Sequence, residues 1–136
     1  MKLNKSTNWV VPTGYHQANI ADARILNDSK KGEQLRIIAK VISLVSPTEE
    51  YVIRKVYSCN DGNDVIKMLK ELLGDQIKQV INLDGEIIPD GLLLLHGIKI
   101  DVEIEQVVTK GHADPFSDVL QIRKFGELIQ EPPKAA

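Results

Sequence analysis

The sequence predicts a mainly β fold: a small domain of five strands with one helix inserted between the third and the fourth. Apolar residues recur at every second position in several segments, which is typical of strands with one buried face. Between residues 64 and 73 the apolar spacing changes to that of a helix. The length of 136 residues suits one domain, which can bury a core of its own.

Three strands are predicted before the helix. The first covers residues 14–26 and alternates in part, and the turn-forming sequence NDSKKGE follows it. The second, residues 34–45, has apolar side chains at successive odd positions and is the clearest strand of the chain. The third, residues 51–58, is rich in β-branched and aromatic residues.

The helical insert follows the third strand. The helix is expected at residues 64–73, where the apolar positions fall on one face, and Gly74 can end it. A further helical turn is expected at residues 75–81, and one short helical turn at residues 92–97.

Two strands complete the domain. Residues 98–108 alternate cleanly, with isoleucine and valine on one face and charged side chains on the other. A long loop is expected at residues 109–118 and the last strand at residues 119–125. We interpret the acidic face of the fourth strand as solvated, or as a surface for a basic partner; it carries Asp101, Glu103 and Glu105.

This order of elements matches the OB-fold, a five-stranded Greek-key barrel. Other small mixed sheets share the order and stay open as alternatives. We assign the OB-like barrel to residues 14–128, an N-terminal arm to residues 1–13 and a flexible tail to residues 129–136.

The first half of the chain also carries a short family motif. It reads Gly14-Tyr15-x-x-Ala18-x-Ile20, then Ser29-Lys30-Lys31-Gly32-x-x-Leu35-x-Ile37-x-x-x-Val41. Over roughly residues 12–45, this pattern resembles the opening of the small OB-fold single-stranded-DNA-binding proteins of phages and mobile elements. The resemblance implies an OB-fold, non-catalytic binding of single-stranded DNA, and a role in DNA replication or DNA recombination of a phage or mobile element.

The net charge of −2 hides an uneven distribution. Residues 1–58 hold nine basic and five acidic side chains, a charge of +4. Residues 59–136 hold eight basic and fourteen acidic side chains, a charge of −6. The basic half contains the first three predicted strands, and the face of the second and third strands is the usual oligonucleotide site of an OB barrel. The acidic total is therefore compatible with a nucleic-acid partner.

Proteins bind single strands with cations that contact the nucleic-acid backbone and with aromatic rings that stack on the bases. Arg36 and Lys40 share one face of the second strand, and Lys30 and Lys31 lie at the tip of the first hairpin. A role in solubility and in protecting a strand edge is an equal alternative for these four residues.

The third strand allows two arrangements. Tyr51, Lys55 and Tyr57 lie on one face, and Arg54 lies on the other between two valines. We prefer the tyrosine face outward, as two rings with a lysine between them, because the two valines form a plausible core pair. In the other arrangement the tyrosines belong to the core and Arg54 alone points out.

Two further residues complete the candidate nucleic-acid-binding set. Trp9 can stack on a base or pin the arm to the barrel. Arg123 on the last strand can extend the binding groove. For both, packing within the domain is the more common role.

Enzymes, metal sites and membrane spans have sequence signals that this chain lacks. His112 and Asp114 offer two metal ligands without a third at a recognisable spacing. The sequence holds no nucleophile elbow, phosphate-binding loop, dinucleotide fingerprint or C-x-x-C pair. Its longest aliphatic run, residues 92–95, is far shorter than a membrane span. We therefore expect a non-catalytic cytoplasmic protein without a cofactor, a metal or a membrane partner.

Two functions suit such a domain. The first is sequence-tolerant binding of single-stranded DNA by phosphate neutralisation and base stacking. The second is a protein–protein interaction or assembly module on the same barrel, which docks through its acidic fourth strand or forms a homo-oligomer. Charge reversal at Arg36 and Lys40 separates them, because only the first function loses its ligand.

Overall fold

The computed structural model describes residues 4–60, 62–108 and 115–129. Between the fourth and the fifth of the strands given below lie α1 (Gly62–Leu73) and two 3-10 helices, η1 (Gly74–Gln79) and η2 (Pro89–Leu95). The mainly β fold with a helical insert is confirmed. The strands are β1 (Ser6–Asn8), β2 (Gly14–Asp28), β3 (Gly32–Val41), β4 (Glu49–Ser58), β5 (Lys99–Val107) and β6 (Phe116–Lys124).

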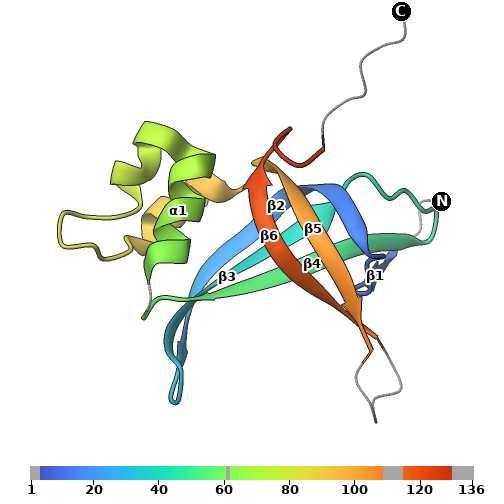
Figure 1. Ribbon diagram of the computed structural model, residues 1–136, viewed down its shortest axis with the longest axis horizontal. Helices are drawn as coiled ribbons and strands as arrows, with labels where there is room; N and C mark the ends of the chain where they lie inside the picture. Colours follow the sequence, from blue (N-terminus) through green and yellow to red (C-terminus); the bar gives the residue numbers. More distant parts are fainter. Residues whose placement is uncertain (1–3, 61, 109–114, 130–136) are drawn as a thin grey trace, which may run out of the picture.

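The strands form one mixed sheet in the order β1-β4-β3-β2-β5-β6. The pair of β1 with β4 is parallel, and the other four pairs are antiparallel. The sheet curls, with α1 at one end and β1 at the other (Figure 1). Within the described residues β4 and β6 do not pair, so the sheet is open where the predicted five-stranded barrel would close.

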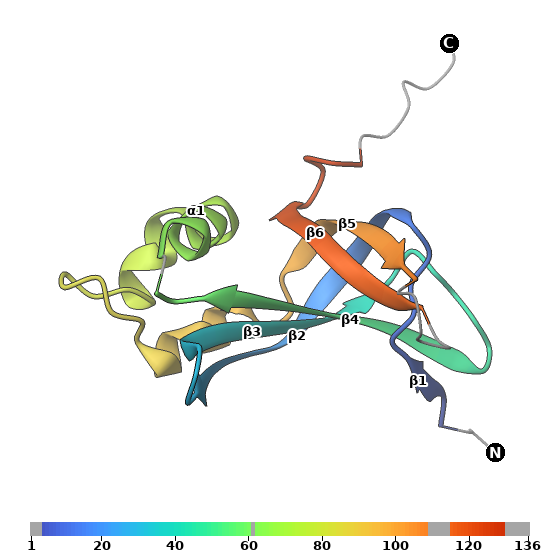
Figure 2. The ribbon, with the colours of Figure 1, turned by 60° about the horizontal axis from the view of Figure 1, so that its bottom comes forward.

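The long strand β2 belongs to both halves of the curled sheet. Its residues 14–19 pair with β5, and its residues 18–28 pair with β3. The register with β3 shifts between Ile20 and Asp22, and such bulges bend a strand and increase its twist. The bend brings β5 and β6 back over β3 and β4, as Figure 2 shows.

The core lies inside the curl and beneath α1. On β3, Leu35, Ile37 and Ala39 are buried at alternate positions, as the sequence pattern predicts. Gly74, with a φ of +57°, ends α1 at the expected place. The apolar face of α1 contributes Val65, Met68, Leu69 and Leu73 to the same core.

The described part of the N-terminal arm is packed against the sheet. β1 pairs with residues 49–51 of β4. Beyond it, Val11 is fully buried, and its backbone N–H donates a hydrogen bond to Ser117 Oγ. The Ser117 hydroxyl donates in turn to the Val11 carbonyl oxygen at 3.1 Å. These bonds fasten the arm to the start of β6.

Some strand ends differ from the sequence prediction. β3 ends at Val41 rather than at residue 45, and β6 begins at Phe116 rather than at residue 119. Phe116 lies opposite Val107 of β5, so pairing with a distant strand draws in residues whose local sequence is typical of a loop. The candidate metal ligands His112 and Asp114, and residues 130–136 of the predicted tail, lie outside the described residues.

Candidate nucleic-acid interface

The register between β3 and β4 decides which side chains share a face of the sheet, because directly opposed residues point to the same side. Ala39 lies opposite the buried Ile53, on the core side. Ile38 lies opposite the exposed Arg54, on the other side. We call this second side of the two strands the outer face; it carries Arg36, Ile38, Lys40, Val52, Arg54 and Val56.

The tyrosine face of β4 is the inner one. Tyr57 lies opposite the buried Leu35, and both Tyr51 and Tyr57 pack against the core. Burial raises the pKa of Tyr57, and the nearby carboxylate of Asp64 adds to the rise. The preferred arrangement, with both tyrosines outward, is therefore wrong, because register with β3 turns their rings toward the core. Arg54 is the side chain that points out.

Acidic neighbours offset part of the positive charge of the outer face. Arg36 Nη2 lies 3.6 Å from Asp22 Oδ2, which Arg24 Nε approaches to 3.0 Å. Lys40 Nζ lies 3.5 Å from Glu50 Oε2. Arg36 and Lys40 therefore lie on the predicted face, but each contacts a carboxylate that a phosphate would have to compete with.

The hairpin between β2 and β3 holds Lys30 and Lys31 in an ordered turn. Asp28 Oδ1 accepts hydrogen bonds from the backbone N–H groups of Lys30 at 2.8 Å and Lys31 at 3.0 Å, which lowers the pKa of Asp28. Asn60 Nδ2 donates to the Lys31 carbonyl oxygen at 2.9 Å and so ties the hairpin to the end of β4. Both lysines are exposed, and neither is in an ion pair with a carboxylate of the described residues.

Comparison with known proteins adds no assignment to this geometry. No protein-family model matches the chain, and no curated protein matches it. A function for this surface is therefore inferred from its residues and their placement.

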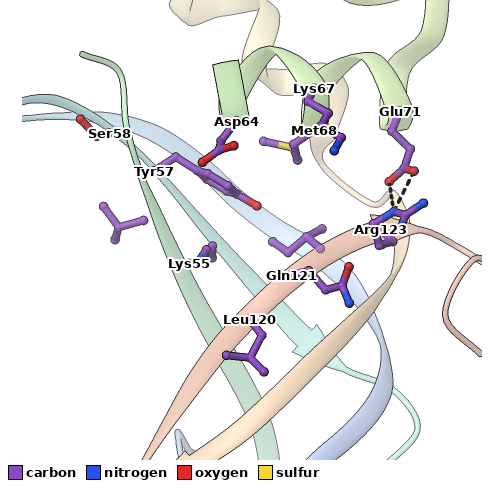
Figure 3. A pocket seen from close by; sticks show the side chains of 12 residues that line it. Lys55, Tyr57, Ser58, Asp64, Lys67, Met68, Glu71, Leu120, Gln121 and Arg123 are labelled. Atoms are coloured by element: carbon purple, nitrogen blue, oxygen red, sulfur yellow. Dashed lines mark hydrogen bonds and ion pairs between the residues drawn. The ribbon is translucent and has the colours of Figure 1, made fainter. Parts of the chain in front are cut away.

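A cleft of about 550 Å³ lies between β4, β6 and α1, and we call it the helix cleft. Figure 3 shows Tyr57 of β4 lying beneath α1, while Arg123 of β6 reaches Glu71. Lys55 Nζ lies 5.6 Å from the centre of the Tyr57 ring. Arg123 Nε lies 2.8 and 2.9 Å from the two carboxylate oxygens of Glu71, so this candidate residue is already engaged with α1.

A second hollow, of about 450 Å³, lies where the arm meets β4 and β6. Two aromatic side chains on it are half exposed, Trp9 at 49% and Phe116 at 50%. Arg54 joins this hollow to the outer face, and no ion pair of the described residues includes it. We call it the Trp9 hollow; its lining is Trp9, Ile53, Arg54, Phe116 and Ser117.

Sequence reasoning missed Phe116 as a candidate residue. The sequence predicts a loop around Phe116, because Gly111, Pro115 and several polar residues precede the last aliphatic run. A signal was present, since proline is tolerated at the start of a strand and an aromatic residue follows Pro115 directly.

The acidic residues of β5 do not form one solvated face. Glu105 is exposed, but Asp101 is fully buried. Asp101 Oδ2 accepts hydrogen bonds from the backbone N–H groups of Gly126, Leu128 and Ile129 at 3.0, 3.1 and 2.9 Å. The interpretation of a regular solvated acidic strip is wrong at Asp101, because the segment after β6 folds over it.

Within the described ranges, no three His, Cys, Asp or Glu side chains gather where they could hold a metal ion. In the same part of the chain, no helix combines the length and the apolar character that a membrane crossing needs.

Proposed function

We propose that the protein binds single-stranded nucleic acid, without catalysis, on an OB-like barrel. β2 to β6 follow the strand order of the OB-fold, with α1 between β4 and β5. In that fold, oligonucleotides bind on the face of the second and third strands and on the loop between the first and second. The corresponding parts of this chain are the outer face on β3 and β4 and the β2–β3 hairpin.

The observation that carries the proposal is a path of cations along these parts. Lys30 and Lys31 lie at the hairpin end of β4, to which Asn60 ties them. Arg54 lies four residues before Ser58, the last residue of β4, which is about 13 Å at about 3.3 Å per residue. Arg36 of β3 lies between them, opposite Val56. A path of this length suits a strand of several nucleotides.

The mechanism follows from the chemistry of these side chains. Lysine and arginine neutralise phosphates and release counterions, which gives affinity without reading the sequence. Apolar side chains of the outer face, such as Ile38 and Val56, lie between the cations and offer surface to sugars and bases. The motif at the start of the chain favours single-stranded DNA as the ligand, and replication or recombination of a phage or mobile element as the setting.

The rival function, a protein-interaction or assembly module, is less well supported. It uses the acidic fourth predicted strand and any exposed sheet edge, and of that strand Asp101 is buried under the chain's own segment after β6. We keep this function as an outcome of the test.

An equilibrium titration tests the proposal. Labelled oligo-dT and a duplex of equal length are titrated with the protein at two salt concentrations. We expect tighter binding of oligo-dT, and an affinity that falls with salt at a log–log slope of about −0.7 for each phosphate contacted. The double variant Lys30→Glu with Lys31→Glu should bind about tenfold more weakly and with a shallower salt slope.

The matched control is Lys70→Glu with Lys78→Glu, which makes the same change in net charge on exposed lysines of α1 and η1. An equal loss in both double variants would contradict a hairpin site, because net charge alone would then explain it. No binding of the unmodified protein to oligo-dT at low salt would overturn the function and favour the assembly module.

A further inference from the structure

The Trp9 hollow places two large aromatic side chains where water reaches about half of each. Trp9 is 49% and Phe116 is 50% exposed, although burial of either ring inside the core would be favourable. Exposed apolar side chains that lie together can mark an interaction site, whereas single scattered ones are ordinary on a protein surface. The buried side chain of Ile53 adds apolar lining from β4.

Both rings belong to backbone that is already fixed. On the arm, Asn8 Nδ2 donates to Glu49 Oε2 at 3.3 Å, and Asn8 Oδ1 accepts from the Val10 N–H at 2.9 Å. These bonds hold the residues on either side of Trp9. On β6, Ser117 follows Phe116 and forms the paired hydrogen bonds with Val11. A ligand would therefore meet two rings carried on fixed backbone and would lose little binding energy to ordering that backbone.

Arg54 gives the hollow its charge. Its guanidinium is exposed, and no carboxylate of the described residues pairs with it. A planar cation beside aromatic rings suits a ligand that is itself planar and carries a negative group at its edge. A nucleotide has this composition, with a flat base and an attached phosphate.

We propose that the Trp9 hollow binds one base of a single strand, stacked on Trp9 or Phe116, with Arg54 on the adjoining phosphate. This inference rests on the proposed function and names the place where stacking occurs. Trp9 and Phe116 take the stacking role that the tyrosines of β4 cannot take, because those tyrosines face the core. Since every base has a flat face, the subsite tolerates all four bases.

The experiment uses the single tryptophan of the chain as its reporter. Trp9 emission is followed while the protein is titrated with oligo-dT of about 16 nucleotides, and with an abasic oligonucleotide of the same length. We expect oligo-dT to quench the emission and the abasic strand to leave it nearly unchanged. Phe116→Ala and Trp9→Ala, followed with a labelled oligo-dT, should each bind it about tenfold more weakly, and Trp9→Phe should retain most of the affinity.

Phe125→Ala is the matched control, because Phe125 is 45% exposed just beyond the other end of β6. Its affinity for oligo-dT should equal that of the unmodified protein. Trp9→Ala and Phe116→Ala should bind the abasic strand as tightly as the unmodified protein does. That strand has no base to stack on either ring, so removing a ring removes no contact.

The outcomes separate this inference from the function on which it rests. If the unmodified protein binds neither strand, the proposed function fails and the subsite with it. If the protein binds oligo-dT but Phe116→Ala and Trp9→Ala lose no more affinity than Phe125→Ala, only the stacking subsite is overturned. Equal quenching by the abasic strand would also overturn it, because the base would not be the group that reaches Trp9.

Discussion

Arg123 of β6 and Glu71 of α1 form a two-pronged contact, in which Arg123 Nε lies 2.8 and 2.9 Å from the two carboxylate oxygens. The backbone N–H of Lys124 donates to the same carboxylate at 3.1 Å. Glu71 thus connects α1 to the end of β6. Arg123, a candidate nucleic-acid contact by sequence, has a structural partner in the folded chain.

We expect Arg123→Ala to lower the free energy of unfolding by about 1 kcal/mol, because the ion pair is partly exposed. Urea denaturation measures this loss. Lys124→Ala is the control, since it removes a neighbouring positive charge without removing the side-chain pair. Both variants should bind oligo-dT alike; a larger loss of affinity in Arg123→Ala would return Arg123 to the nucleic-acid surface.

Asp101 anchors the segment that follows β6. Its carboxylate is fully buried and accepts three backbone N–H bonds through Oδ2. Asp101→Ala leaves those donors without their partner, and we expect it to lower the free energy of unfolding by about 2–3 kcal/mol. Glu105→Ala, on the same strand but exposed, should change it by less than about 0.5 kcal/mol. Equal stability of the two variants in urea would contradict the anchoring role.

Gly91 allows η2 to approach η1 closely. A Cβ at this position would overlap the carbonyl oxygen of Gln79, which is backbone and cannot rotate away. Gly91→Ala should therefore destabilise the protein by about 1–3 kcal/mol through local displacement of the chain. Gly62→Ala is the control, because its nearest atom to a Cβ is Ile66 Cδ1 at 3.8 Å. Thermal unfolding of both variants checks the prediction, which a normal melting temperature for Gly91→Ala would contradict.

The partly buried side chain of Tyr57 makes stability depend on pH in the alkaline range. Burial raises its pKa above the ordinary value of 10.0, so the folded chain keeps this proton where the unfolded chain releases it. The contribution is complete below about pH 10 and is lost as the pH rises above that value. We expect the free energy of unfolding to fall less steeply between about pH 9 and 11 in Tyr57→Phe than in the unmodified protein.

Tyr15→Phe serves as the matched control for this pH profile, because Tyr15 is 53% exposed. It should retain the alkaline slope of the unmodified protein. If Tyr57→Phe kept that slope as well, another group would be responsible for the loss of stability.

Local sequence determined five of the six strands, the helix and their order, whereas β1 lies in the segment predicted to be an arm. Alternating apolar residues predicted β2, β3 and β5, and β-branched and aromatic residues predicted β4, each with ends within a few residues of those in the structure. Gly74 marked the end of α1. The excess of basic residues before residue 59 also placed the candidate cations on the first strands of the sheet. These properties depend on neighbouring residues, so the sequence contains them directly.

Tertiary structure decided which faces and which residues form the candidate site. Alternation groups Tyr51 with Tyr57 and separates them from Arg54, but two-fold periodicity does not say which group is buried. The register with β3 made that choice and turned Arg54 outward. In the same way, the Trp9 hollow and the burial of Asp101 arise from contacts between segments far apart in the chain, which no local pattern records.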